Sequence, residues 1–360
     1  MREEDVRFMR IALGLARRGA GLVNPNPMVG AVVVKDGEVI GVGWHQRFGG
    51  KHAEVNAIED ARRKGHDVKG ATMYVTLEPC SHWGKQPPCA DRIIKEGLER
   101  VVVAMVDPNP VVSGRGIEKL RSAGIEVEVG VLEEEARKLN EVFIKYVTTG
   151  MPFVSIKLAL TLDGFIATET GSSQWITGEA ARARVQELRK MHMAIMVGSG
   201  TVLRDNPRLN CRLDNCPERV KVVLDRSGRV AEEVRRGRRF NLFNDGRAIF
   251  FTERPGLFEG VGEAYPIIEP GRILRKLGEL GIDSVLIEGG RIACEFLAFA
   301  DKFYLFYGPK LFGRGIKPFE CLKVEDANKA PPLRVESIER IGESFLVTAY
   351  PGGRDVQWNR

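Results

Sequence analysis

Three residues in the first hundred of this chain carry the side chains that a catalytic zinc ion needs. They are His52, Cys80 and Cys89, which together offer one imidazole and two thiolates. A zinc ion that does chemistry takes three protein ligands and keeps a fourth position open for water. Glu54 lies two residues after the histidine, near the start of a predicted helix, where its carboxylate can take a proton from that water and pass it to a leaving group. The spacing therefore predicts a hydrolytic zinc site with Glu54 as the proton shuttle.

The order of these residues, H-x-E followed by P-C and a second cysteine, is typical of zinc-dependent deaminases that act on nitrogen heterocycles. Zinc brings the pKa of bound water to about 7, so hydroxide is available at neutral pH. The alternative is a closed structural site, which would need a fourth ligand such as His45 or His82. We favour the catalytic site because a structural one has no use for Glu54.

The two cysteines are separated by eight residues, Ser-His-Trp-Gly-Lys-Gln-Pro-Pro. Nucleic-acid and cytidine deaminases typically have a gap of about two residues. The longer segment carries His82 and Lys85, which we expect to contact a substrate directly. The ammonium group of Lys85 suits a phosphate, although a solvated loop cation is the other interpretation.

The second half of the chain carries a less specific signal, the turn Glu288-Gly289-Gly290. It follows an apolar predicted strand, 284–287, and precedes a helical segment, 292–298. Two glycines at such a turn let backbone amides approach a phosphate at a helix N-terminus, but an ordinary glycine turn fits as well. The half contains no G-x-G-x-x-G after its first strand and is therefore not an obvious Rossmann domain. Cys211 and Cys216 could form a metal pair, but no histidine lies near them in sequence, and we favour two loop thiols.

The segments that must position these residues alternate between helical and strand-like patterns. The predicted order in the first half is helix 3–18, strands 29–34 and 39–43, helix 53–64, strand 71–77, helix 90–96, strand 100–106, helix 117–123, strand 125–131 and helix 133–146. The second half has predicted strands at 153–160, 194–197, 221–224, 248–251 and 284–287, with helices between them. This alternation predicts α/β layered domains. Thr148-Thr149-Gly150 interrupts the pattern, which places two domains at 1–147 and 148–360.

Length and composition fit a globular protein of two domains. The chain has 360 residues, of which 43% are hydrophobic, and no apolar run approaches the roughly 18 residues that span a bilayer. The first ten residues lack the apolar core of a signal peptide, so we expect a cytoplasmic protein. In that compartment the six cysteines are expected to be ligands or buried thiols rather than disulfides.

The net charge of +6 allows two interpretations. A nucleic-acid binder is one, but no basic tract is interleaved with aromatic residues as in single-strand binders. We favour the other, a need for cationic groups around phosphorylated small molecules.

Collinear motifs cover nearly the whole chain. In the first half they are Asn24-Pro25-Asn26-Pro27-Met28-Val29-Gly30, Gly43-Trp44-His45, His52-Ala53-Glu54, Thr76-Leu77-Glu78-Pro79-Cys80 and Asp107-Pro108-Asn109-Pro110. In the second half they are Leu162-Asp163-Gly164, Ser173-Gln174-Trp175-Ile176-Thr177, Gly200-Thr201-Val202, Asp205-Asn206-Pro207 and Ile287-Glu288-Gly289-Gly290. Together they resemble the bifunctional riboflavin-biosynthesis deaminase–reductase family.

The resemblance implies two consecutive reactions. The first domain, expected to be a cytidine-deaminase-like three-layer domain, would deaminate 2,5-diamino-6-(5-phosphoribosylamino)pyrimidin-4(3H)-one, here called the diaminopyrimidine ribotide, at the carbon that bears the 2-amino group. By resemblance, His52, Cys80 and Cys89 hold the zinc and Glu54 is the proton shuttle. The residues that would hold the pyrimidine are Asn26, His45, His82 and Lys85.

The second domain, expected to have a dihydrofolate-reductase-like fold, would use NADPH to reduce the ribosyl group of 5-amino-6-(5-phosphoribosylamino)uracil, here called the uracil ribotide, to ribityl. The resemblance implies NADPH contacts at Ala159, Trp175, Thr201, Asp205 and a run from Gly290 to Phe296 that includes Arg291 and Ile292. It implies substrate contacts at Ser173, Arg189, Leu209, Arg212 and Glu288. A homo-oligomer formed through this domain is expected on the same ground.

Several arginines in this domain suit phosphate groups. Arg189 and Arg212 are candidate phosphate clamps because a guanidinium binds phosphate through two hydrogen bonds, with surface cations as the alternative. Lys157 follows the same logic less strongly. Arg226 stands where the family has a small hydroxyl residue, so this position either loses a cofactor contact or strengthens selection for the 2′-phosphate of NADPH.

Two other functions fit part of the sequence. A deaminase of tRNA or of a free nucleoside could carry an RNA-binding or regulatory second domain, but the long cysteine gap, Lys85 and the second-half motifs count against it. An inactive zinc-stabilised scaffold would not need Glu54. We therefore expect a bifunctional enzyme with zinc and NADPH as cofactors, phosphorylated pyrimidines as substrates, and no nucleic-acid or membrane partner.

Overall fold

The computed structural model describes residues 2–83, 87–109 and 112–353. The chain divides into two compact units, Met1–Gly150 and Met151–Arg360. Lys85 lies outside the described residues, so its predicted substrate contact stays a prediction. In the described part of the chain, no helix is long and apolar enough to cross a membrane.

The first unit is built on a five-stranded sheet with the strand order β2-β1-β3-β4-β5. The strands are β1 (Gly30–Lys35), β2 (Glu38–Trp44), β3 (Thr72–Val75), β4 (Arg100–Val103) and β5 (Glu126–Val129). Strand β1 runs antiparallel to β2 and β3, whereas β3, β4 and β5 are parallel. The hairpin between β1 and β2 turns at Asp36 and Gly37, which both have positive φ, as the tight turns that match strand twist require.

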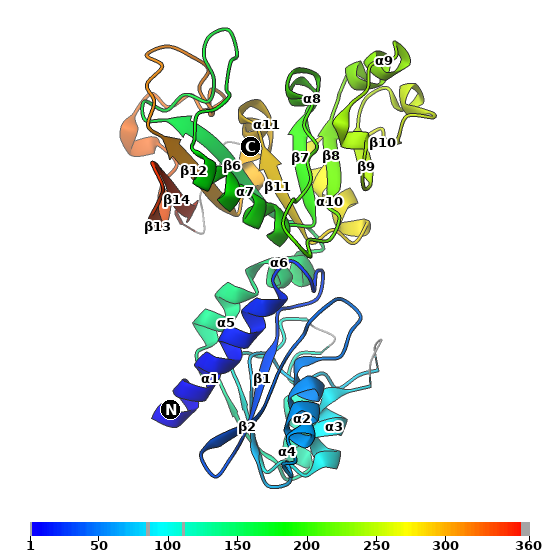
Figure 1. Cartoon of the computed structure of the whole chain (residues 1–360), viewed down its shortest axis with the longest axis vertical. Helices are drawn as coiled ribbons and strands as arrows, with labels where there is room; N and C mark the ends of the chain where they lie inside the picture. Colours follow the sequence, from blue (N-terminus) through cyan, green and yellow to red (C-terminus); the bar gives the residue numbers. More distant parts are fainter. Residues whose placement is uncertain (1, 84–86, 110–111, 354–360) are drawn as a thin grey trace. The chain divides into compact units, whose positions relative to one another are not determined.

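Helices cover both faces of this sheet (Figure 1). They are α1 (Glu3–Ala16), α2 (Ala53–Arg63), α3 (Cys89–Glu96), α4 (Arg115–Ser122), α5 (Glu133–Leu139) and α6 (Glu141–Thr149), with one 3-10 turn, η1 (Arg17–Gly19). Gly30 of β1 lies against Ala12 of α1, and Gly43 of β2 lies against Ala57 of α2. Gly30 is paired with Trp44 across the two strands, so these two residues point to the same face of the sheet. Gly43 precedes Trp44 and points to the opposite face, because side chains alternate along a strand. Helices α1 and α2 therefore cover opposite faces. The unit is therefore three layers deep.

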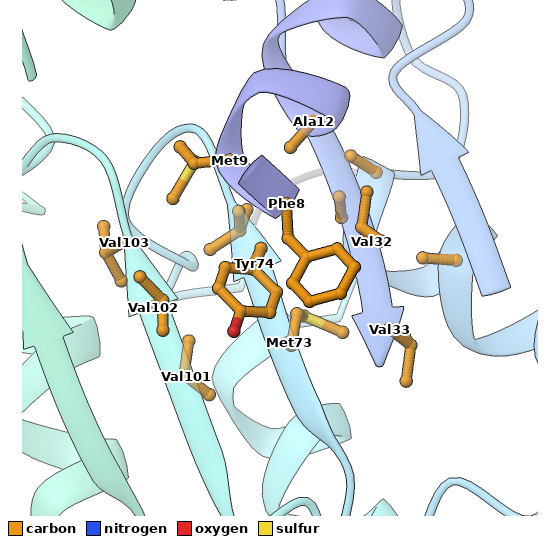
Figure 2. Close-up of a cluster of buried hydrophobic side chains, with 14 of the residues drawn as sticks. Phe8, Met9, Ala12, Val32, Val33, Met73, Tyr74, Val101, Val102 and Val103 are labelled. Carbon is orange, nitrogen blue, oxygen red and sulfur yellow. The ribbon is translucent and has the colours of Figure 1, made fainter. Parts of the chain in front are cut away.

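The core of the first unit fills both faces of the sheet, under α1 on one face and under α2 on the other. Figure 2 shows Phe8 and Met9 of α1 beside Val32 and Tyr74 of the strands, and all four side chains are at most 2% exposed. The central strands are continuously apolar, as expected for strands covered on both faces. This packing gives the rigid frame from which the loops at the strand ends project.

One predicted helix of this unit is wrong in its length. The apolar spacing predicts an uninterrupted helix over 133–146, but the structure has two helices, α5 and α6, that meet at Asn140. Asn140 has φ −107° and ψ 22°, outside the helical region. Its buried side chain bonds the backbone of Met28 in a distant segment, a contact to which helical periodicity gives no clue.

The second unit is built on a nine-stranded sheet with the order β10-β9-β8-β7-β11-β6-β12-β14-β13 (Figure 1). The strands are β6 (Phe153–Thr161), β7 (Ala194–Gly198), β8 (Val220–Leu224), β9 (Ala248–Phe251), β10 (Glu263–Tyr265), β11 (Ser284–Glu288), β12 (Lys302–Gly308), β13 (Leu333–Ile341) and β14 (Ser344–Pro351). The first seven strands in this order are parallel, and β14 and β13 continue the sheet antiparallel.

The α-helices of the second unit connect these parallel strands. They are α7 (Glu179–Met191), α8 (Ser199–Asp205), α9 (Arg229–Arg235), α10 (Pro270–Glu279) and α11 (Gly290–Phe296). Short 3-10 turns complete the unit: η2 (Asn241–Phe243), η3 (Pro255–Phe258), η4 (Leu297–Phe299) and η5 (Ala327–Lys329). Crossover helices between parallel strands confirm the predicted α/β class. They also bring the carboxyl ends of β6, β7 and β11 to one edge of the sheet.

Candidate active sites

Helix α2 carries His52 and Glu54 at its start. His52 is the residue before the first turn, and Glu54 lies within that turn with 3% of its surface exposed. The helix approaches β2 closely, since a Cβ on Gly43 would lie 2.3 Å from the backbone nitrogen of Ala57. Because only glycine permits this approach, β2 holds the helix, and with it both side chains, in place.

The two cysteines reach the same point from a loop and from the start of another helix. Cys89 is the first residue of α3, and its backbone N–H donates to Cys80 Sγ over 3.3 Å. Hydrogen bonds from Cys89 and from His52 outweigh burial and lower the pKa of the Cys80 thiol to about 4. Cys80 is therefore held as a thiolate, which is the form that binds metal ions.

The three predicted ligands meet closely enough to hold a metal ion. The Nδ1 atom of His52 lies 3.2 Å from Cys89 Sγ and 3.6 Å from Cys80 Sγ, and all three donor atoms lie within 4.8 Å of one another. Tetrahedral zinc with bonds of about 2.1 Å to nitrogen and 2.3 Å to sulfur separates these atoms by about 3.6 Å. The donor set and its spacing therefore fit zinc. Within the described residues, no other histidine, cysteine or carboxylate belongs to this group.

A cavity of about 290 Å³ opens beside these ligands. His52, Glu54 and Cys80 line it, and so do the predicted substrate residues, Asn26, His45 and His82. Burial raises the pKa of Glu54, and this favours a carboxyl group that can hold a proton. A buried carboxyl group with a raised pKa thus lines the same cavity as the metal ligands.

His45 and Asn26 form a fixed pair on the wall of this cavity. Asn26 Nδ2 donates to His45 Nε2 over 3.1 Å, and His45 Nδ1 donates to the Lys51 carbonyl over 3.0 Å. Burial lowers the pKa of His45, which keeps the ring neutral. With both ring nitrogens engaged, His45 is poorly placed to be a fourth zinc ligand, which argues against a closed structural site.

Sequence reasoning missed several residues that line this cavity. They are Phe48, Glu78, Asp107, Asn109, Val112 and Phe143. Burial raises the pKa of Asp107 to about 6. Glu78, Asp107 and Asn109 belong to the quoted motifs, which was a usable signal. Nothing in the sequence points to the aromatic contacts of Phe48 and Phe143.

Glu78 anchors the segment that carries three of these residues, Asp107, Asn109 and Val112. Its Oε2 accepts hydrogen bonds from the backbone N–H groups of Asp107 (3.1 Å) and Gly114 (2.9 Å). Its Oε1 accepts from those of Gly116 (2.8 Å) and Ile117 (3.3 Å). One buried carboxylate thus connects the loop that carries Cys80 to the start of α4.

The second unit holds a larger cleft, of about 650 Å³, at the carboxyl ends of β6, β7 and β11. This edge of a parallel sheet is where open α/β folds bind ligands. The predicted residues that line the cleft are Ala159, Ser173, Trp175, Arg189, Thr201, Asp205, Leu209, Arg212, Glu288, Gly290 and Arg291. Ile292 does not line it, because its side chain is 4% exposed and packs in the core of the unit.

Three charged side chains, each 13–16% exposed, meet inside this cleft. Arg189 donates from Nε to Glu288 Oε1 over 2.8 Å and from Nη2 to Oε2 over 3.0 Å, and Lys157 Nζ lies 3.9 Å from Oε2. Burial raises the pKa of Glu288, but the two cations outweigh it and lower the pKa to about 2. Burial lowers the pKa of Lys157. The cluster carries one more positive than negative charge, which suits an anionic ligand.

The rest of the cleft is also basic. Its lining includes the cationic residues Lys157, Arg182, Arg189, Arg204, Arg208, Arg212 and Arg291, against the acidic residues Asp205 and Glu288. Arg226 follows β8 and pairs with Glu295 of α11, outside this lining. At the first residue of α11, a Cβ on Gly290 would lie 1.9 Å from Ile166 Cδ1, so the end of the Ile166 side chain would have to move to admit it.

The expectation that the cysteines outside the zinc site are thiols is wrong. Cys211 is bonded to Cys216, and Cys294 to Cys321, as disulfides. Their Cα atoms lie 6.2 and 5.8 Å apart, within the range that a disulfide spans. The prediction rested on the expected compartment, whereas the fold brings each pair together. Cys80 and Cys89 are free, as predicted for metal ligands.

Family comparisons match both units. Residues 2–105 match the family described as the cytidine and deoxycytidylate deaminase zinc-binding region. Residues 152–347 match the RibD C-terminal domain. The first unit is thus a cytidine-deaminase-like domain, and the second is a reductase domain of the dihydrofolate-reductase-like type.

Similar proteins match over nearly the full length. The riboflavin biosynthesis protein RibD of Aquifex aeolicus is 41% identical over 96% of this chain and 98% of its own, and that of Bacillus amyloliquefaciens is 42% identical over 98% and 99%. A crystal structure from Thermotoga maritima, described as a diaminohydroxyphosphoribosylaminopyrimidine deaminase/5-amino-6-(5-phosphoribosylamino)uracil reductase, superposes with a TM-score of 0.89 at 48% identity and covers 97% of this chain and 99% of that one. The chain belongs to the RibD family of bifunctional deaminase–reductases of riboflavin biosynthesis.

Proposed function

We propose that the first unit deaminates the diaminopyrimidine ribotide and that the second reduces the uracil ribotide with NADPH. The observation that carries the first half is the meeting of His52, Cys80, Cys89 and Glu54 at one cavity. The basic cleft of the second unit supports the other half, because both of its ligands would carry phosphate groups.

The deamination exchanges the 2-amino group for oxygen, with water consumed and ammonia released. Bound at the three ligands, zinc supplies hydroxide at neutral pH by lowering the pKa of water to about 7. Glu54 accepts the proton that the water loses and delivers it to the leaving nitrogen, so the amino group departs as ammonia. Burial, which raises the pKa of Glu54, suits a carboxyl group that carries a proton between these two steps.

The heterocycle would be held by side chains on the cavity wall. His45 and Asn26 form a hydrogen-bonded pair there, and His82 lines the same space. The Asn26 amide and the His82 ring offer hydrogen bonds at the edges of a flat ring, while the His45 ring fixes the orientation of Asn26. Orientation of this kind lowers the barrier by placing the reacting carbon next to the nucleophile. Lys85 is proposed to bind the ribotide phosphate.

In the second unit, the amino-sugar ring opens to an imine, and NADPH supplies the hydride that adds to its carbon. A proton is added to the imine nitrogen, so the products are the ribityl amine and oxidised cofactor. Arg189 and Arg212 are proposed to bind the substrate phosphate, with Ser173, Leu209 and Glu288 completing that site. The proposed NADPH contacts are Ala159, Trp175, Thr201, Asp205 and the turn from Gly290 through Arg291 and Ile292, the last through its backbone because its side chain is buried.

We also propose a homo-oligomer formed through the second unit. Strand β13 is the last strand of the nine-stranded sheet, and its Val335 and Ile338 side chains are 52% and 68% exposed. An exposed apolar edge strand is a surface that pairing with another chain would cover. Size-exclusion chromatography with light scattering of the wild type and of Val335→Glu tests this, and a monomeric wild type would contradict it.

A coupled assay with the diaminopyrimidine ribotide tests the proposed reactions. Ammonia release and NADPH oxidation are followed separately, with and without a zinc chelator. We expect both signals, with the chelator abolishing ammonia release. In the presence of chelator, NADPH oxidation should persist when the uracil ribotide is supplied directly. Ammonia release without any NADPH oxidation from either ribotide would contradict the proposal for the second unit, and steep salt-dependent RNA binding would favour a nucleic-acid substrate instead.

A further inference from the structure

The side-chain amide of Asn140 forms two hydrogen bonds with the backbone of Met28. Met28 N–H donates to Asn140 Oδ1 over 2.8 Å, and Asn140 Nδ2 donates to the Met28 carbonyl over 3.0 Å. The two residues are 112 positions apart in sequence, and Asn140 is 1% exposed. The side chain thus pairs with the polar groups of one residue as a neighbouring strand would.

Met28 lies in the segment that forms one wall of the deaminase cavity. Its neighbours Asn26, Pro27 and Val29 all line that cavity. The Val29 carbonyl accepts the backbone N–H of His45 over 2.9 Å, and Asn26 bonds the His45 ring. A shift of Met28 would therefore move both members of the Asn26–His45 pair.

Helices α5 and α6 are separated at Asn140, the same residue that bonds Met28. Asn140 N–H still bonds the Ala136 carbonyl, and its own carbonyl accepts from Ile144, so the backbone is paired on both sides of the break. Three residues later, Phe143 of α6 lines the same cavity. The α5–α6 junction thus contacts the cavity wall both through the Met28 backbone and directly.

We propose that Asn140 is a positioning residue for the deaminase substrate, which acts by holding the 26–29 segment so that Asn26 and His45 face the heterocycle. This inference rests on the proposed function of the first unit. Asn140 itself is not among the residues that line the cavity. Its loss should therefore weaken substrate binding more than the chemical step.

The test compares Asn140→Ala and Asn140→Asp with Tyr74→Phe in the full-length zinc-loaded protein. Tyr74→Phe is the control because it removes a buried side-chain hydrogen bond of the first unit, to Asp5, away from the cavity, where Asn140→Ala removes two. We expect Asn140→Ala to raise KM for ammonia release about 10-fold, with kcat within about threefold, zinc content unchanged and reduction of the uracil ribotide unchanged. Asn140→Asp keeps the acceptor for Met28 N–H but places its second carboxylate oxygen against the Met28 carbonyl, so its effect should be at least as large. Tyr74→Phe should leave KM unchanged.

Hydrogen exchange gives a second measurement that needs no substrate. In Asn140→Ala the backbone amides of Met28 and its neighbours should exchange about 10-fold faster, while those of β3 keep their protection. If both Asn140 variants only lower Tm, as Tyr74→Phe does, with KM and exchange of 26–29 unchanged, the inference is overturned. A fall in kcat or zinc content without a rise in KM overturns it as well. If the wild type releases no ammonia from the ribotide, the proposed function fails, whereas faster exchange in Asn140→Ala would still show that Asn140 holds this segment.

Discussion

Arg189 binds Glu288 through two hydrogen bonds inside the cleft of the second unit, and this pair keeps the carboxylate ionised. The Nε–Oε1 and Nη2–Oε2 distances are 2.8 and 3.0 Å. Burial alone would raise the pKa of Glu288, but Arg189 and Lys157 lower it to about 2. Glu288 is therefore a fixed counter-ion at neutral pH rather than a proton donor, and its removal would leave two buried cations unbalanced.

We expect Glu288→Gln to lower kcat/KM for reduction of the uracil ribotide by about 100-fold, because breaking a buried charge pair disorders its partners at a cost of roughly 3 kcal/mol. Ammonia release by the other unit should stay within about twofold of the wild type. Both rates are measured on the same preparation, so each activity serves as the folding control for the other. Equal losses in both would contradict a local role.

We expect the second unit to lose stability in mild acid because of His192. Burial lowers its pKa to about 4, and the ring bonds the Leu188 carbonyl and Ser155 Oγ. The unfolded chain has a histidine pKa of about 6.5 and binds the proton first, so this contribution is complete above pH 6.5 and is lost as pH falls towards 4. Between pH 7 and pH 5, the wild type should lose about 2 kcal/mol more unfolding free energy than His192→Gln. Urea unfolding measures this, with His66→Gln, at an exposed histidine, as the control.

Glu54→Gln separates zinc binding from proton transfer. The amide keeps the size of the side chain but cannot accept the proton, so ammonia release should fall by about 10³-fold. Zinc content, measured by atomic absorption, should be unchanged, because Glu54 is not one of the three ligands. A variant that deaminates normally would remove Glu54 from the mechanism.

Two glycine-to-alanine changes should have opposite effects on stability. At Gly43, a Cβ would lie 2.3 Å from Ala57 N and push α2 from the sheet, so we expect a loss of about 1–3 kcal/mol and weaker zinc binding. At Gly14, within α1, nothing lies within 4 Å of the added Cβ, and the change should add about 0.5–1 kcal/mol. Thermal unfolding and zinc titration of both variants measure these effects. A stable, zinc-loaded Gly43→Ala would show that α2 can shift without cost to the site.

The zinc site could be predicted from sequence because its metal-binding side chains lie in short motifs. His52 and Glu54 share one helix start, and Cys89 begins another, so local spacing already restricts where the ligands point. The alternation of strands and helices similarly predicts α/β units, because burial on two faces leaves continuous apolar runs. The apolar run at 284–287 likewise predicted a strand that ends at the turn Glu288-Gly289-Gly290.

Contacts between distant segments were beyond this reasoning. Asn140 interrupts a helix where its side chain bonds the Met28 backbone. The apolar residues on either side keep a helical spacing, so the sequence gives no sign of the break. Cys294 and Cys321 are 27 positions apart, and only the folded chain shows that they meet. Ile292 was placed at the cofactor by resemblance, and its side chain packs in the core, so only its backbone remains for the proposed contact.

Glu78 limits how this deaminase could be redesigned. Its two oxygens accept four main-chain hydrogen bonds, from Asp107, Gly114, Gly116 and Ile117, so the residue anchors the loop that leads to α4. Glutamine would turn an N–H group towards other donors, and aspartate would fall short by one methylene. An engineer who wants to admit a different heterocycle can vary the side chains of that loop, but only around an unaltered Glu78.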